Sequence, residues 1–205
     1  NAQVKNFKLT NSFFELTSEK ASALGSITGR LEGKLDTVYS DAIINTAGVN
    51  VGGIAGYKLT DIESSVTNCW YDGTIHLIGD SSKNIGGVMG RLINGTVVID
   101  NCLFSGEIKV AGKTRTVNTG GFLGNVAAGT VDIRASLNTG EIIVVGKDKV
   151  YACGRVFGQV ADSEKITIKL DNTYFTDKGS THFWYCAGIF AATGTIPGIF
   201  QYIAA

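Results

Sequence analysis

Few side chains in this 205-residue sequence stand at spacings that support chemistry. The chain has four cysteines, but none forms the C-x-x-C arrangement of zinc sites and thiol–disulfide enzymes. The two histidines, His76 and His182, do not accompany a cysteine pair as a metal site or an activated thiol would require. His76 fits a solvated strand position, and His182 fits packing at a cap. We therefore predict no metal site, no cofactor and no catalytic thiol.

The carboxylates also lack the pairing that catalysis on sugars needs. A glycoside hydrolase places two acids on either side of one bond. This sequence contains no adjacent Asp-Asp pair and no acidic column across the repeats, because Thr67 and Arg134 stand where Asp100 and Asp171 occur in the other copies. A calcium-dependent lyase would need an acidic cluster beside a basic residue, and the sequence shows none. We therefore predict that the protein is not an enzyme. A β-helical carbohydrate-active enzyme is the catalytic alternative.

The elements that position these residues repeat along the chain. A glycine block, NVGGIAG at 50–56, recurs as NIGGVMG at 84–90 and NTGGFLG at 118–124, with a diverged copy, YACGRVFG, at 151–158. A second block, VTNCWYDGTI at 66–75, recurs as IDNCLFSGEI at 99–108, IRASLNTGEI at 133–142 and LDNTYFTD at 170–177. The copies of both blocks follow one another at 33 or 34 residues, except the last copy of the second block, which follows after 37. Because two different blocks keep nearly the same spacing, the repeat is structural.

Each repeat reads as short strands joined by polar loops. Its runs are rich in β-branched and aromatic residues and alternate with period two, and glycines punctuate them. Units of this kind cannot bury a face alone, so they stack. The sequence predicts an all-β fold, a β-solenoid that is a right-handed parallel β-helix of about six coils with capping ends. We expect one structural domain: capping strands at 1–22, the repeat β-helix at 23–180, and the last coil with a cap at 181–205.

Equivalent residues of successive coils form columns, so the sequence can be read across the repeats. Val66 and its counterparts are apolar and are predicted to point inward. Strict alternation places Asn68 and Trp70 on the same side, where stacked asparagines would hydrogen-bond along their column.

The same alternation predicts outward positions for three aromatic residues, Tyr71, Phe104 and Phe175. Exposed rings in one column would form a platform for sugar rings or for a partner's apolar patch. Loops of the same coils are long enough to cover the rings instead, and the sequence leaves both arrangements open.

The cysteines fall into two columns. Cys69 and Cys102 are 33 residues apart, as are Cys153 and Cys186, so each pair lies on adjacent coils. We predict Cα separations within about 7 Å, the limit for a disulfide. Two bridges and two pairs of packed free thiols are both compatible with this spacing.

Composition excludes two classes of partner. Lys+Arg and Asp+Glu both total 18, and no basic run occurs, which argues against nucleic acid. No stretch approaches the ~20 apolar residues of a membrane helix, so membrane insertion is not expected. With 44% hydrophobic and 18% charged residues, the chain has ample apolar surface for a core.

The pattern GG-[IVF]-x-G followed by [IV]-x-N-C-aromatic-x-x-G-x-[IV] resembles the GLUG repeat, over about residues 24–191. That repeat occurs in secreted and surface proteins of bacteria, including immunoglobulin A-cleaving metallopeptidases and adhesin-like proteins. The resemblance implies a secreted or cell-surface location and a larger multidomain chain. It does not imply peptidase activity, because the H-E-x-x-H signature is absent. We expect a module for adhesion or recognition of a glycan or a host or matrix protein, or alternatively a passive stalk or spacer flanking an enzyme domain.

Overall fold

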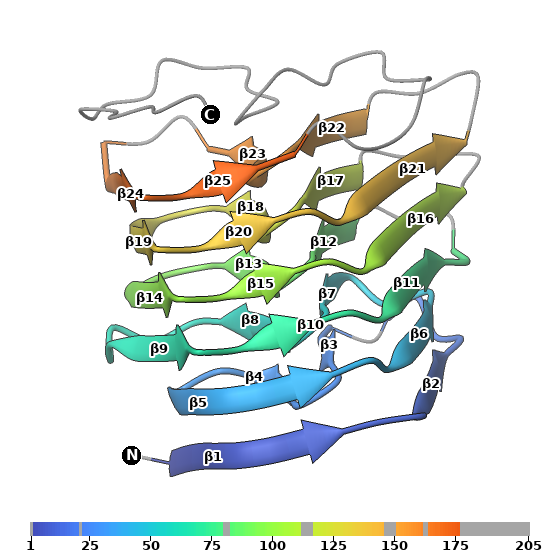
Figure 1. Ribbon diagram of the computed structural model, residues 1–205. Coiled ribbons are helices and arrows are strands. Elements are labelled where there is room, and N and C mark those ends of the chain that lie inside the picture. The colour runs from blue at the N-terminus through green and yellow to red at the C-terminus, as the bar shows by residue number, and fades with distance from the viewer. Residues whose placement is uncertain are drawn as a thin grey trace.

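The protein is a β-solenoid built from parallel strands (Figure 1). The computed structural model describes residues 2–20, 22–79, 83–111, 117–145, 151–161 and 164–176. These residues form 25 strands in four sheets, here called A to D, and they contain no helix. No membrane-spanning helix is therefore found in the part of the chain that the structure describes. The all-β solenoid predicted from the sequence is confirmed.

Sheet A is the widest face of the coil, and most of its rungs consist of two short strands in line. It contains β1 (Ala2–Leu9), β5 (Gly33–Ser40), β9 (Ser64–Thr67), β10 (Trp70–Tyr71), β14 (Thr96–Asp100), β15 (Leu103–Phe104), β19 (Gly129–Arg134), β20 (Leu137–Asn138), β24 (Ile166–Asp171) and β25 (Tyr174–Phe175).

The other three sheets have five strands each. Sheet B contains β2 (Phe13–Leu16), β6 (Ile43–Thr46), β11 (Thr74–Leu77), β16 (Glu107–Ala111) and β21 (Glu141–Val145). Sheet C contains β3 (Leu24–Gly25), β7 (Asn50–Gly52), β12 (Lys83–Gly86), β17 (Val117–Gly120) and β22 (Tyr151–Gly154). Sheet D contains β4 (Thr28–Arg30), β8 (Ala55–Lys58), β13 (Met89–Leu92), β18 (Leu123–Val126) and β23 (Phe157–Val160).

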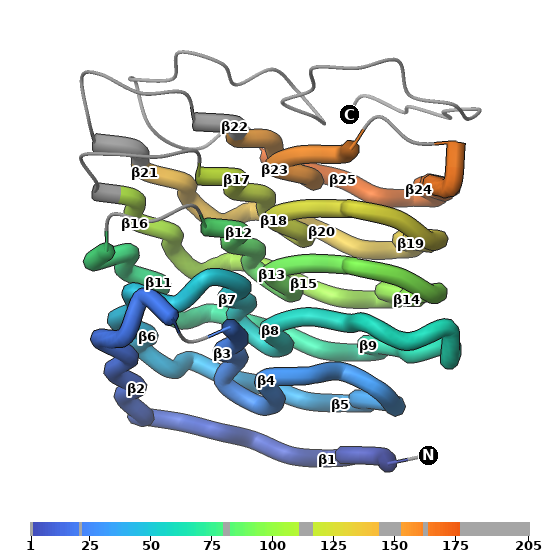
Figure 2. The backbone as a smooth tube through the Cα atoms, turned by 180° about the vertical axis from the view of Figure 1, so that it is seen from behind, coloured from blue at the N-terminus to red at the C-terminus, as the bar shows by residue number. Residues whose placement is uncertain are grey.

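The chain passes through sheets C, D, A and B in turn and completes four such turns from β3 to β21. Incomplete coils, β1–β2 and β22–β25, flank them, so the described chain makes slightly fewer turns than the six expected. In Figure 1, β5, β10, β15 and β20 run from left to right across the front, and β4, β8, β13 and β18 lie behind them. The chain therefore runs left to right across the front while it rises from the N-terminus at the bottom, which makes the coil right-handed. Figure 2 shows the same stack from behind.

The strands β1 and β2 lie in the segment that the sequence assigns to a cap at 1–22. They pair in parallel register with β5 and β6, so they form the first rung of sheets A and B. The expected last coil and cap at 181–205 lie outside the described residues.

One residue in every rung of sheet A has a left-handed backbone conformation. These residues have φ between 44° and 55° and are Asn6, Thr37, Asn68, Asn101, Ala135 and Asn172. Asparagine tolerates this region better than other L-residues, because its short polar side chain bonds locally. The left-handed residue also breaks the period-two alternation, so that Val66 and Cys69, three residues apart, both point into the core.

Replacing Ala135 with asparagine is expected to stabilise the fold by about 1 kcal/mol, because alanine pays the left-handed cost without a compensating bond. For a chain of this size that corresponds to a rise of roughly 2–4 °C in melting temperature. Thermal unfolding followed by circular dichroism measures the shift. Ala128→Asn, in a turn outside the left-handed positions, is the control and should leave the melting temperature unchanged. No gain from Ala135→Asn would contradict the explanation.

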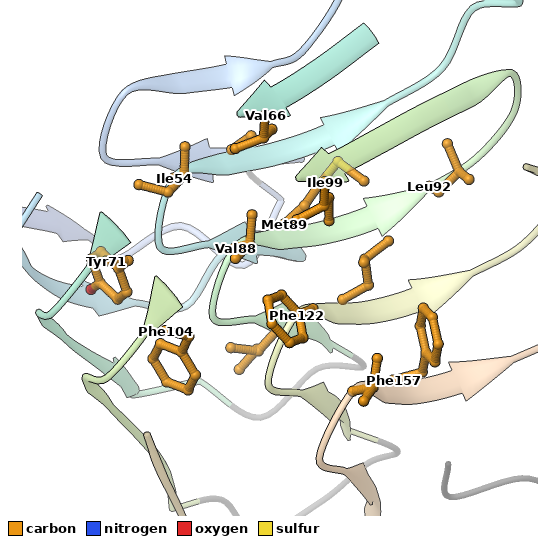
Figure 3. Packing of buried hydrophobic residues seen from close by; sticks show 14 of the residues in the cluster. Ile54, Val66, Tyr71, Val88, Met89, Leu92, Ile99, Phe104, Phe122 and Phe157 are labelled. Atoms are coloured by element: carbon orange, nitrogen blue, oxygen red, sulfur yellow. The ribbon is translucent and has the colours of Figure 1, made fainter. Parts of the chain in front are cut away.

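The core lies inside the coil and is layered by rung (Figure 3). The turn between sheets C and D contributes one apolar side chain per coil; Ile27 in the first coil is partly buried, and the others, each at most 1% exposed, are Ile54, Val88, Phe122 and Val156. The glycines before Ile54, Val88 and Phe122 have no side chain, so atoms of neighbouring residues can approach their Cα atoms closely. A Cβ on Gly53 would lie 2.2 Å from the Tyr71 ring, and one on Gly87 would lie 2.5 Å from Phe104. The two repeated blocks of the sequence therefore pack on each other across the core.

Glu32 lies between β4 and β5, and several polar groups around this loop contact its carboxylate. Its carboxylate accepts hydrogen bonds from Arg30 Nε at 2.9 Å, from the backbone N–H groups of Leu59 and Thr60 at 3.3 and 3.2 Å, and from the Thr60 hydroxyl. The buried ammonium of Lys58 lies 3.5 Å away. Burial opposes ionisation, but the hydrogen bonds from Thr60 and Arg30 outweigh it and lower the pKa of Glu32 to about 2.

This lowered pKa predicts a pH-dependent contribution to stability. A carboxylate whose pKa is depressed on folding stabilises the protein above its unfolded pKa of about 4.3, and loses that contribution as pH falls toward 2. Glu32→Gln is expected to cost about 1–2 kcal/mol at pH 7, after allowance for partial exposure. The difference from the wild type should shrink between pH 4.5 and 2. Urea unfolding of both proteins across this range measures it, and a constant difference would contradict the assignment.

Candidate functional site

The predicted outward column of aromatic residues is wrong. Tyr71 and Phe104 are 0% exposed, and their rings stack inside the core with centroids 6.2 Å apart and planes at 12° (Figure 3). The Tyr71 hydroxyl donates a hydrogen bond to the Ala42 carbonyl at 2.9 Å. Phe175 is partly buried and packs against the same core. The cause is the left-handed residue before each pair, which reverses the side that the following strand presents.

The reversal places another set of side chains outside. Trp70, predicted inward, pairs in register with Tyr39 on one side and Leu103 on the other, and Leu103 continues to Leu137 and Tyr174. These five residues, one per rung, are here called the outward column. Trp70, Leu137 and Tyr174 are 40, 38 and 37% exposed, so three of the five rungs present a large apolar side chain to solvent in one line. The spacing along the column is the strand separation of about 4.8 Å.

The aromatic end of the outward column is held by specific contacts. The Tyr39 and Trp70 rings meet edge to face, with centroids 5.0 Å apart and an interplanar angle of 76°. The Trp70 indole N–H donates to Ser105 Oγ at 2.6 Å, and Ser105 Oγ in turn donates to Asp72 Oδ1 at 2.6 Å. The Lys8 ammonium lies 4.8 Å from the centre of the Tyr39 ring. The rings are therefore fixed in orientation while part of their surface stays in solvent.

Polar residues border the outward column on one side. The left-handed asparagines are exposed, and Asn101 Nδ2 donates to Asn68 Oδ1 at 2.8 Å. Asn68 Nδ2 donates to Asp36 Oδ1 at 2.9 Å, and this bond, with Lys5 close by, lowers the pKa of Asp36. The asparagine ladder that the sequence predicts therefore exists between rungs, but on the outer surface rather than in the core.

Carboxylates lie at the other border of the column. Asp41 and Asp72 follow Tyr39 and Trp70 by two residues each, and burial together with these two charges raises the pKa of Tyr39. An apolar column between amides and carboxylates offers both ring faces and hydrogen-bonding groups. This combination suits a ligand that has apolar C–H faces and many hydroxyl groups.

Three of the four cysteines lie within the described residues. Cys69 and Cys102 are neighbours on adjacent rungs, since the Leu103 N–H donates to the Cys69 carbonyl at 2.9 Å, and both are buried free thiols. The thiol hydrogen bond from Cys102 lowers the pKa of Cys69, whereas burial raises that of Cys102. Cys153 is also a buried free thiol, and Cys186 lies outside the described residues. The alternative of a Cys69–Cys102 bridge is therefore not realised here.

The remaining candidates for chemistry stay apart. Within the described ranges, no three His, Cys, Asp or Glu side chains gather as metal ligands would. His76 lies on β11 and is partly buried, next to Asn45 and Lys109 in the register of sheet B. His182 lies outside the described residues.

Comparisons with protein-family models, with curated proteins and with solved structures found no match for this chain.

Proposed function

We propose that the protein is a non-catalytic β-helical module of a secreted or cell-surface bacterial protein, and that it acts in adhesion by binding glycans. The observation that carries the proposal is the outward column, in which large apolar side chains are 37–40% exposed on three of its rungs. A contiguous line of large apolar side chains that stay partly in solvent is typical of a surface that binds a partner. The secreted location and the bacterial source rest on the resemblance to the GLUG repeat.

The chemistry of the column favours a sugar over an apolar peptide. The Trp70 and Tyr39 rings supply faces on which the C–H groups of a sugar ring can stack. Asp41 and Asp72, two residues after each ring, can accept hydrogen bonds from sugar hydroxyl groups. The Trp70–Ser105–Asp72 hydrogen bonds orient the indole in advance, so binding loses little side-chain freedom.

A glycan array followed by calorimetry with the best oligosaccharide tests the proposal. Trp70→Ala is expected to weaken binding by at least about tenfold, the effect of losing a central aromatic contact. Its melting temperature should fall by no more than a few degrees, because the side chain is 40% exposed. Ile78→Ala, which removes another exposed apolar side chain outside the column, is the control and should leave affinity unchanged.

The competing function is a passive stalk or spacer. A stalk would bind none of the glycans on the array, and Trp70→Ala would change nothing but solubility. Glycan binding that persists with full affinity in Trp70→Ala would place the site elsewhere on the module. Either result would overturn the proposal.

A further inference from the structure

The N-terminal end of the stack exposes the inside of the solenoid. Val4 and Phe7 on β1 are in register with Leu35 and Val38 on β5, whose side chains are 3 and 1% exposed in the core. Val4 and Phe7 occupy the same inward columns, yet they are 38 and 44% exposed. Among the described residues nothing packs beneath them, and Figures 1 and 2 show β1 as the outermost rung.

The backbone at this end is open as well. Every inner rung of sheet A pairs with a rung on each side, whereas β1 pairs only with β5. Residues 2–8 of β1 are all exposed. An edge strand of this length presents a row of unpaired N–H and C=O groups that can template another strand. The unpaired edge and the apolar side chains of β1 are therefore both accessible from the N-terminal end of the stack.

We propose that this end is a docking site for an extended polypeptide segment that adds to β1 as one more parallel rung. Such a segment would make the same contact that already joins each rung of sheet A to the next, so the docked rung would continue the sheet. This is strand addition, in which main-chain hydrogen bonds supply affinity and side-chain pockets supply specificity. The site lies at the end of the stack and is independent of the outward column.

The existing rungs define the chemistry of the partner. It carries apolar residues opposite Val4 and Phe7, and between them a residue that accepts the left-handed conformation of Asn6. An acidic residue opposite Lys5 fits the charge order, since Lys5 on β1 already pairs with Asp36 on β5 at 3.3 Å. A segment without this spacing of three between its inward residues would slip out of register.

A peptide copied from residues 33–46 of this chain, GKLDTVYSDAIINT, meets all of these conditions and serves as the probe. Labelled with a fluorophore, it should bind the full chain saturably in an anisotropy titration. A peptide carrying the change Val38→Asp should bind at least tenfold more weakly. A scrambled peptide should not bind.

The protein-side variants locate the site. Phe7→Asp and Val4→Asp are each expected to weaken binding of the probe at least tenfold. Ile62→Asp, a change at a side chain that is 50% exposed before β9, should leave it unchanged. Circular dichroism of each variant shows whether the fold is retained. The peptide variant above needs no altered protein, so it tests the proposal even if Phe7→Asp misfolds.

Three results would overturn the proposal. The first is absence of saturable binding, and the second is equal binding by the wild type and Phe7→Asp. The third is a concentration-dependent dimer in sedimentation that Phe7→Asp abolishes, because it would assign the end to a second copy of the chain. Loss of glycan binding in Trp70→Ala bears on the proposed function alone and leaves this site unaffected.

Discussion

Replacing Phe104 with alanine is expected to lower the free energy of unfolding by about 3–5 kcal/mol. The ring is 0% exposed, stacks on Tyr71 in the previous coil and fills the space above Gly87. It also touches the next coil, where a Cβ on Gly140 would lie 2.5 Å from its Cε1. Truncation therefore loses contacts in several layers and leaves a cavity that the stacked backbones cannot close. Urea unfolding followed by circular dichroism measures the loss.

Leu137→Ala is the matched control for this prediction. Leu137 belongs to the next rung of the same sheet, but it lies on the outward column and is 38% exposed. Its truncation should cost less than Phe104→Ala, about 1 kcal/mol, because a large part of the side chain is already in water and its loss leaves no closed cavity. Equal losses for the two variants, or a negligible loss for Phe104→Ala, would contradict the inward orientation and return the aromatic pair to the surface.

The architecture was predictable because it depends on the repeat spacing, which two different blocks of the sequence show. Both the glycine block and the asparagine block recur with nearly the same period, and only stacked coils satisfy both spacings. The described residues make slightly fewer turns than the six expected, because the sixth copy of the glycine block falls in 181–205, outside the described residues. The spacing of the repeats alone does not show whether a copy forms a complete turn or only two or three of its strands.

The candidate site was predicted on the wrong side of the sheet for a local reason. Strict alternation requires a strand that continues through Asn68, but Asn68 has a φ of 54° and separates β9 from β10. The signal was present in the sequence, since an asparagine stands at this point in three of the four blocks and asparagine is the residue that favours this conformation. Reading it as a break would have placed Trp70 outside and Tyr71 inside.

The buried lysines could not be predicted from pattern at all. Lys58 occupies a position whose register partner in the next coil is Leu92, and its side chain is 0% exposed. Its ammonium is satisfied by the Thr60 carbonyl at 2.8 Å and by Glu32, a residue 26 positions earlier in the sequence. A single sequence shows the charge but not the partners that make its burial tolerable.

Replacing Gly87 with alanine is expected to cost more than about 4 kcal/mol or to prevent folding, the largest effect we predict for a single methyl group. A Cβ at this position would lie 2.2 Å from the Gly121 carbonyl oxygen and 2.5 Å from the Phe104 ring. The first contact is with backbone, which can move only if neighbouring rungs separate and their hydrogen bonds lengthen. The expected result is insoluble protein or a large fall in melting temperature, measured by thermal unfolding of whatever remains soluble.

Gly29→Ala tests whether this cost belongs to the position or to glycine in general. Gly29 lies in β4, where the nearest atom to an added Cβ is the Ala23 carbonyl oxygen at 3.6 Å, an ordinary contact. Alanine at Gly29 should therefore be neutral or slightly stabilising, since it reduces the freedom of the unfolded chain. If Gly87→Ala kept near-native stability, adjacent rungs would have to separate beyond their usual distance of about 4.8 Å to admit the methyl group. In that case the contact between the glycine block and the aromatic ring would not be the reason that glycine recurs at this position of the repeat.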